Sequence, residues 1–210
     1  MKKILLSLMI VLAATFVSYG QEAQETLFGG NLSLSNVGIM VEPGIQVTQL
    51  AGETAGFFQL RGGIILNDKF TIGGFYGQLL NDVRPASFGT TLPARAHLDS
   101  WTAGGFLEYT VFSNKLVHFS FPLALGIKEV EIDNEGRDFD FDETKTLFVE
   151  PRALVEINLH RFARLNAGVG YRIMGNTLEN AIGVPDAGNA LTFQIGLKMG
   201  VFSFKQLKGN

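Results

Sequence analysis

The chain has 210 residues, of which 46% are hydrophobic and 18% charged, and it contains 25 Gly, 18 Phe and no Cys. This composition excludes a disordered chain, a disulfide scaffold and a metal site with Cys ligands. There are 17 basic and 20 acidic residues, so the formal net charge is −3, and because no Lys/Arg cluster runs along the chain we expect no nucleic-acid partner.

The first 20 residues have the pattern of a secretory signal peptide. Lys2 and Lys3 precede an apolar run over 4–17, and small residues flank Tyr19 before Gln21. The run is shorter than the roughly 20 residues of a membrane-spanning helix, which favours cleavage over anchoring. The chain is therefore expected to divide into a signal peptide (1–20), an N-terminal segment (21–36), a β-barrel (37–204) and a C-terminal tail (205–210).

From residue 37 onward, hydrophobic side chains recur with a period of two, which predicts β-strands. In the last segment every odd residue from Leu191 to Val201 is apolar, and every even residue from Thr192 to Gly200 is polar or Gly. Each segment has about the 9 to 11 residues that a tilted strand needs to cross a bilayer. The predicted strands are 37–49, 55–66, 70–80, 101–112, 116–128, 147–159, 164–173 and 191–201.

The connections between these strands alternate in length. Tight turns are expected at 67–69, 113–115 and 160–163, and longer links at 81–98, 131–144 and 175–189, whereas the first link, 51–54, is short. An even number of strands that begins in the periplasm would place the tight turns there and the longer loops outside the cell. The sequence thus predicts an all-β fold, a closed antiparallel up-and-down eight-stranded transmembrane β-barrel.

The two faces of the predicted strands differ in a way that favours a membrane barrel over a soluble one. The polar face is rich in Gly and carries charges of both signs, as expected of an interior where ion pairs fill a narrow lumen. These interior charges are Glu42, Arg61, Glu108, Lys128, Glu150, Arg152, Glu156, Arg172 and Lys198. The apolar face carries aromatic residues near strand ends, where a membrane-interface girdle would lie. They include Tyr76, Trp101, Tyr109 and Tyr171. A soluble barrel that binds an apolar ligand, with the apolar set turned inward, is an alternative.

Two segments, VHFSFPLALG (117–126) and LFVEPRALVEINLHRFARLNAGVGYRI (147–173), together with the signal peptide, resemble a family of small, largely uncharacterised outer-membrane barrels of Bacteroidota. The residues that carry the resemblance are His118, Ser120, Pro122, Gly126, Glu150, Pro151, Tyr171 and Arg172. It covers mainly 98–204 and implies a Gram-negative outer-membrane location and no known activity. Expected partners are outer-membrane lipid, lipopolysaccharide and the barrel assembly machinery. Outer-membrane strands commonly end in a terminal aromatic residue, whereas six residues follow Phe204.

His118 and Ser120 are the sharpest catalytic candidates. They share one face of a strand, and their spacing is similar to the H-x-S of outer-membrane lipid A deacylases. A carboxylate such as Glu156 could orient the imidazole. The strand alternation, however, points both side chains inward, away from lipid, which favours a role in the interior hydrogen-bond network. A lipid A-modifying hydrolase remains an alternative function.

The acidic link at 131–144 is a candidate site for Ca²⁺. Asp138, Asp140 and Asp142 could supply oxygen ligands, but their spacing does not match the helix-loop-helix calcium pattern. A solvated loop without bound ions is the simpler interpretation, with divalent ions that bridge lipopolysaccharide as a possible contact. The three His residues lie on three different elements, so no zinc site is expected, and no cofactor motif occurs.

Eight strands enclose only enough space for their own side chains, so a continuous channel is not expected. The predicted function is that of an integral outer-membrane β-barrel without enzymatic activity. Its role would be structural or would depend on binding through the outer loops, and the sequence does not identify a loop ligand.

Overall fold

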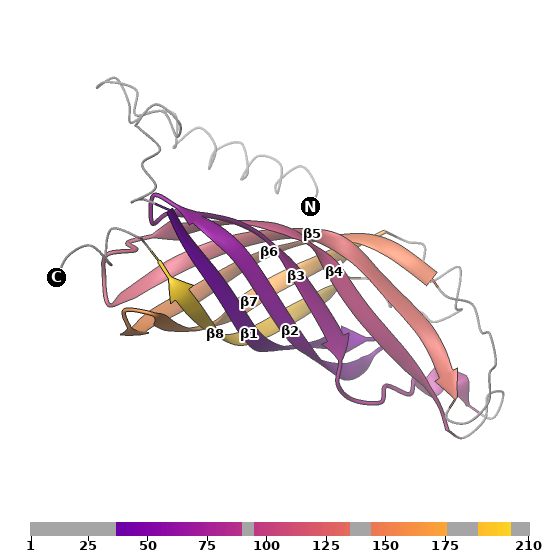
Figure 1. The fold of residues 1–210 in the computed structure, drawn as a ribbon. Helices are drawn as coiled ribbons and strands as arrows, with labels where there is room; N and C mark the ends of the chain where they lie inside the picture. The colour runs from indigo at the N-terminus through magenta and orange to yellow at the C-terminus, as the bar shows by residue number, and fades with distance from the viewer. Residues whose placement is uncertain (1–36, 90–94, 135–143, 176–188, 203–210) are drawn as a thin grey trace, which may run out of the picture. The chain divides into compact units, whose positions relative to one another are not determined.

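The computed structural model describes residues 37–89, 95–134, 144–175 and 189–202. The predicted signal peptide, the N-terminal segment, the C-terminal tail and the three aspartates proposed for Ca²⁺ lie outside these residues. Within them, eight antiparallel strands form one closed barrel in sequence order (Figure 1). The strands are β1 (Val37–Leu50), β2 (Glu53–Leu66), β3 (Phe70–Leu79), β4 (Ala96–Val111), β5 (Val117–Asn134), β6 (Thr144–His160), β7 (Ala163–Met174) and β8 (Ala190–Val201).

The pairing of β1 with β8 closes the barrel and confirms the predicted fold class. Ile45 lies opposite Ile195, and Val47 lies opposite Phe193, so the first and last strands meet in antiparallel register. Closure leaves no free sheet edge along the paired region, so each strand there finds hydrogen-bond partners on both sides. No helix among the described residues is long and apolar enough to cross a membrane.

Tight turns join the strands at one end of the barrel, which we call the turn end, as the sequence predicted. At the opposite end, the loop end, the first connection is the two-residue turn Ala51–Gly52, with φ values of 55° and 83°. Positive φ at both central residues is the geometry of a hairpin turn that matches strand twist, and Gly52 adopts it without strain. The remaining described loop-end link contains a short 3₁₀ helix, Ala86–Phe88.

At the loop end, β4, β5 and β6 extend furthest beyond their predicted bounds, and the predicted links 81–98 and 131–144 are correspondingly too long. β4 begins at Ala96, β5 continues to Asn134 and β6 begins at Thr144. Glu131, which was predicted to lie in a link, is paired with Asp99 in the β4–β5 hairpin, so the sheet continues into this polar region. The pairing satisfies the backbone groups, while the outward side chains in this extension are polar because they lie beyond the apolar band.

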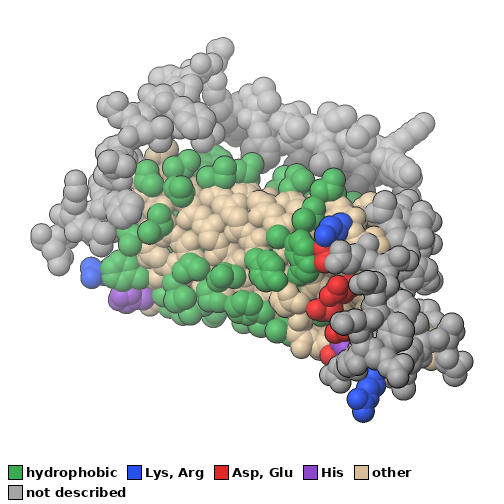
Figure 2. Space-filling view, turned by 45° about the vertical axis from the view of Figure 1, so that its right-hand side comes forward, with side chains coloured by type: hydrophobic (Ala, Val, Ile, Leu, Met, Phe, Trp, Pro, Cys, Tyr) green, Lys and Arg blue, Asp and Glu red, His purple; other side chains and the backbone are tan. Residues whose placement is uncertain are grey.

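The apolar face of the strands lies on the outside. Leu125, Ile72 and Leu107 are each more than half exposed, whereas Glu42, Arg61 and Glu150 are at most 2% exposed. Figure 2 shows hydrophobic side chains spread over one face of the barrel, with acidic side chains gathered beyond them at the loop end. We call the exposed apolar side chains of the strands the apolar belt. This orientation overturns the soluble-barrel alternative, which required the apolar set to point inward.

Buried apolar side chains cluster inside the barrel at the loop end, beyond the interior charges, and we call this cluster the apolar plug. Val83 pairs with Leu98 on β4 and brings the link after β3 against the strand ends. The residues that form this plug are all buried: Leu50, Leu79, Val83, Phe88, Leu98 and Val130. Below them, Phe57, Phe75 and Phe148 also point inward, because β-strand alternation assigns faces by position and not by polarity.

Candidate functional site

The half of the interior nearer the turn end, the lower half, contains a series of linked ion pairs between strands that are far apart in sequence. Arg61 on β2 bridges Glu42 and Glu108, with nitrogen–oxygen distances of 2.9 Å to each. Lys198 on β8 reaches Glu108 at 2.6 Å and also pairs with Glu156. Because each carboxylate faces a cation at hydrogen-bond distance, the cost of burying the charges is offset by pairing.

In the half of the interior nearer the loop end, the upper half, the polar side chains surround Glu150 on β6. One of its oxygens accepts hydrogen bonds at 2.7 Å from Arg152 Nε and from Gln46 Nε2, and the other accepts one at 2.7 Å from Arg172 Nε. Thr192 donates a further hydrogen bond at 3.0 Å. Glu150 is therefore held by four donors from four strands, which is the saturation that a buried carboxylate requires.

Glutamine side chains connect the two halves. Gln194 accepts a hydrogen bond from Arg152 at 2.6 Å and donates one to Glu42 at 3.0 Å. Gln59 accepts a second hydrogen bond from Arg152, at 2.8 Å. The sequence-predicted interior charges thus lie in one lumen, where eight of the nine form a continuous network that fills the barrel.

Lys128 is the member of the predicted set that stands apart. It is 1% exposed, and its ammonium lies 5.5 Å from the centre of the Phe57 ring. No carboxylate oxygen of the described residues lies within ion-pair distance of it. The cation–π contact with Phe57, beneath the apolar plug, supplies part of its stabilisation.

His118 and Ser120 both point into the lumen and are fully buried. His118 Nε2 lies 3.0 Å from one oxygen of Glu156, and Ser120 donates a hydrogen bond of 2.8 Å to the other. The two residues thus meet at a shared carboxylate instead of forming a serine–histidine pair. A nucleophile also needs access to its substrate, and Ser120 is fully buried on the inner face of the barrel.

The four predicted interface aromatics lie on the outer face. Tyr76 and Trp101 stack with ring centres 6.4 Å apart toward the loop end, and Tyr109 packs at 4.9 Å against Phe70 toward the turn end. Tyr171 is 44% exposed near the loop end of β7. Near each end of the outer surface, a Tyr or Trp side chain can keep its apolar ring against the neighbouring apolar side chains and its polar group toward water.

Arg164 is an interior residue that the sequence-based set omitted. It lies on β7 at the turn end, with its guanidinium 3.7 Å from the centre of the Phe202 ring and 3.8 Å from Glu156. Its place on the polar face of its strand was the available signal. Among the described residues, no group of three or more His, Asp or Glu side chains is arranged to hold a metal ion.

The barrel is similar to solved outer-membrane barrels. Neisserial surface protein A matches with 14% identity and a TM-score of 0.56, over 80% of this chain and 97% of that one. Ail, the attachment invasion locus protein of Yersinia pestis, matches with 12% identity and a TM-score of 0.50, over 78% of this chain and 97% of that one. A major outer membrane protein from Thermus thermophilus gives 10% identity and a TM-score of 0.50, over 78% of this chain and 99% of that one.

These similarities show a shared fold at very low sequence identity. A scan against models of protein families found no match, and a sequence search of curated proteins found none either. The chain therefore has the porin-like architecture of outer-membrane β-barrels, and its role has to be argued from its own residues.

Proposed function

We propose that the chain is an integral protein of the Gram-negative outer membrane whose filled barrel anchors a binding surface at the loop end. In this proposal it is exported by a cleaved signal peptide, conducts no solutes and catalyses no reaction. The resemblance of its 98–204 region to small outer-membrane barrels of Bacteroidota supports an origin in that group.

The observation that carries the proposal is the contrast between the two faces of the barrel. The outside presents an apolar belt, which only a lipid environment would cover, and the inside contains a saturated ion-pair network. A soluble protein would not expose that many large apolar side chains. The apolar plug at the loop end, above the charged layer, argues against conduction.

The loop end is the part of the barrel best suited to binding. The extended parts of β4, β5 and β6 rise beyond the apolar belt and form a sheet whose outward residues are polar. Described acidic residues there outnumber basic ones: Glu53, Asp82, Asp99, Glu129, Glu131 and Asp133 against Arg84, Arg95 and Lys145. Attachment is part of the name of the Yersinia pestis neighbour, a precedent for binding by a protein of this fold.

The absence of catalysis is proposed from the geometry of His118 and Ser120. Both are buried against Glu156, on the inner face and close to the turn end. Mass spectrometry of lipid A incubated with wild-type protein should reveal no loss of acyl chains, and the His118→Ala variant should give the same spectrum. Deacylation by the wild type alone would instead assign a hydrolase function.

The first test is migration of the detergent-refolded full chain on a denaturing gel, cold and boiled. A closed membrane barrel resists detergent until it is heated, so the cold sample should migrate differently from the boiled one. The same preparation, inserted into a planar lipid bilayer, should give no discrete conductance steps. Identical migration, with a monomer that stays soluble without detergent, would refute the membrane assignment.

A further inference from the structure

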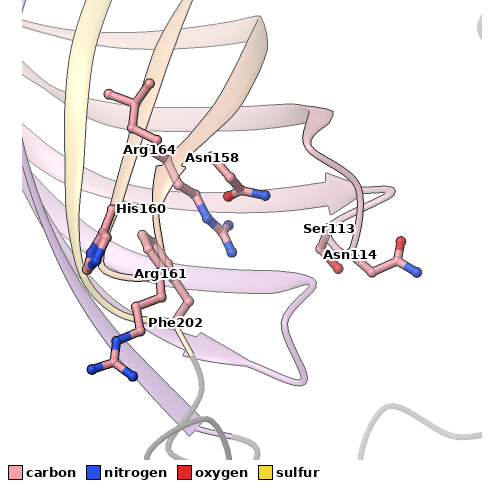
Figure 3. Close-up of a pocket in the computed structure, with 8 residues that line it drawn as sticks. Ser113, Asn114, Asn158, His160, Arg161, Arg164 and Phe202 are labelled. Carbon is pink, nitrogen blue, oxygen red and sulfur yellow. The ribbon is translucent and has the colours of Figure 1, made fainter.

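A polar pocket of about 390 Å³ opens at the turn end, where the β4–β5 and β6–β7 turns approach the end of β8 (Figure 3). Its volume lies within the roughly 300 to 1,000 Å³ typical of small-ligand sites. Ser113 and Asn114 line it from one turn, and Asn158, His160 and Arg161 line it from the other. Leu159, Arg164 and Phe202 complete the wall.

The pocket is lined by hydrogen-bond donors and positive charge. Arg161 and Arg164 are the charged lining residues, with the Arg161 guanidinium resting 4.7 Å from the centre of the Phe162 ring, and no Asp or Glu is among the lining residues. Ser113 and Asn114 add a hydroxyl and an amide that can donate to an oxygen ligand. The set matches an anion that accepts several hydrogen bonds at once, and a forked guanidinium suits phosphate oxygens in particular.

Arg164 has a buried hydrogen-bond donor that is not satisfied within the described residues. It is 8% exposed, and its buried Nε atom has no hydrogen-bond partner. Its nearest ion pair, to Glu156 at 3.8 Å, is long, and Glu156 is already held by Lys198, His118 and Ser120. Stacking on Phe202 at 3.7 Å fixes the plane of the guanidinium. Figure 3 shows the side chain extending between Asn158 and Phe202.

The turn end as a whole would attract an anion. Apart from the eight residues of the interior network, its described charged residues are Asp68, Lys69, Lys115, Arg161 and Arg164, so bases outnumber acids, the reverse of the loop end. Asp68 interacts electrostatically with Arg164 but does not line the pocket. A positive potential over a concave site raises the local concentration of anions.

We propose that this pocket binds a phosphate group, with the Arg164 guanidinium as its fixed donor and Arg161 as a second, more exposed cation. The chemistry is shared by two sources, the headgroup of a glycerophospholipid and a soluble phosphate ester. The pocket lies at the rim of the apolar belt, so a lipid phosphate could reach it from the bilayer surface. The site itself requires only the fold, whereas its placement on the periplasmic leaflet rests on the proposed function.

Calorimetric titration of the full chain, refolded in an uncharged maltoside detergent, tests the site. The probes are inorganic phosphate, glycerol 3-phosphate and dihexanoylphosphatidylglycerol below its micelle concentration. Arg164→Lys keeps the charge and loses the fork, and should weaken binding about tenfold, the effect of one charge-assisted hydrogen bond. Arg161→Gln, at an exposed position, should weaken it roughly two- to fivefold.

Lys69→Gln is the matched control, because Lys69 is an exposed cation of the same barrel end that does not line the pocket. It should leave the affinity within about twofold. Affinity for the lipid at least tenfold above that for glycerol 3-phosphate would assign the site to a headgroup, and similar affinities would assign it to the phosphate group alone.

Absence of binding by all three probes, or equal weakening by Lys69→Gln and Arg161→Gln, would overturn the proposal. The cold and boiled gel assay on the same samples reports on the barrel separately. A normal heat shift without phosphate binding removes only the pocket proposal, whereas loss of the shift, with a monomer that stays soluble without detergent, removes the membrane assignment.

Discussion

Replacing Arg61 with Met should destabilise the barrel by about 3 to 5 kcal/mol, the cost of leaving a buried charge unpaired. The substitution removes both 2.9 Å contacts of the guanidinium and its position 4.1 Å from the centre of the Phe106 ring. Glu108 keeps Lys198 at 2.6 Å, but Glu42 keeps only a neutral donor, Gln194 at 3.0 Å, and Lys198 at 4.0 Å. Most of the loss should therefore arise at Glu42.

Urea unfolding from lipid vesicles, followed by the fluorescence of the single tryptophan, Trp101, measures the free energy of unfolding. Adding Glu42→Gln to Arg61→Met should recover more than half of the loss, because the stranded carboxylate is then neutral. The cycle is completed by Glu42→Gln alone. A loss below about 1 kcal/mol for Arg61→Met, or no recovery in the double variant, would refute this reasoning.

Three further predictions use the same unfolding assay. Arg152→Met should cost less than Arg61→Met, because Glu150 retains Arg172, Gln46 and Thr192; an equal or larger loss would show that Glu150 depends on Arg152. Leu123→Arg, on the apolar belt, should cost roughly 2 to 4 kcal/mol, and Leu159→Arg at the turn end roughly 0 to 1, so equal values would contradict a bilayer around the barrel. Gly104→Ala should cost about 1 to 3 kcal/mol, since its Cβ would overlap Leu125 O and lie 2.9 Å from Phe75 Cζ. Gly105→Ala, whose Cβ would meet Gly73 O at 3.5 Å, is its outward-facing control and should be nearly neutral.

The strands and their faces could be predicted from the sequence because alternation has a fixed period of two. Once Leu191 to Val201 had been assigned to one face, Lys198 necessarily lay on the other, and the structure places it in the lumen. The same alternation assigns Arg164 to the polar face of its strand, and the structure buries it on the inner face as well.

The strand extensions and the specific ion pairs could not be predicted in the same way. Beyond the apolar belt, outward positions such as Asp99 and Glu131 become polar, so the hydropathy pattern that marks a strand disappears while the backbone pairing continues. Which cation meets which carboxylate depends on the stagger of strands around the barrel, which sets the heights of Lys198, Glu108 and Glu156. The turn-end pocket likewise depends on how two turns and the end of β8 converge.

Closure by β1 and β8 has a consequence for how the chain matures. Glu42 lies near the beginning of the barrel sequence, yet Gln194 and Lys198, two of its neighbours, belong to the strand that is synthesised last. Until that strand docks, the interior carboxylates lack part of their counter-charge and the first strand lacks one row of hydrogen bonds. A chain truncated before β8 should therefore remain an open sheet, because no other strand can pair with β1. Insertion into the membrane should accordingly be all-or-none and require the docking of β8.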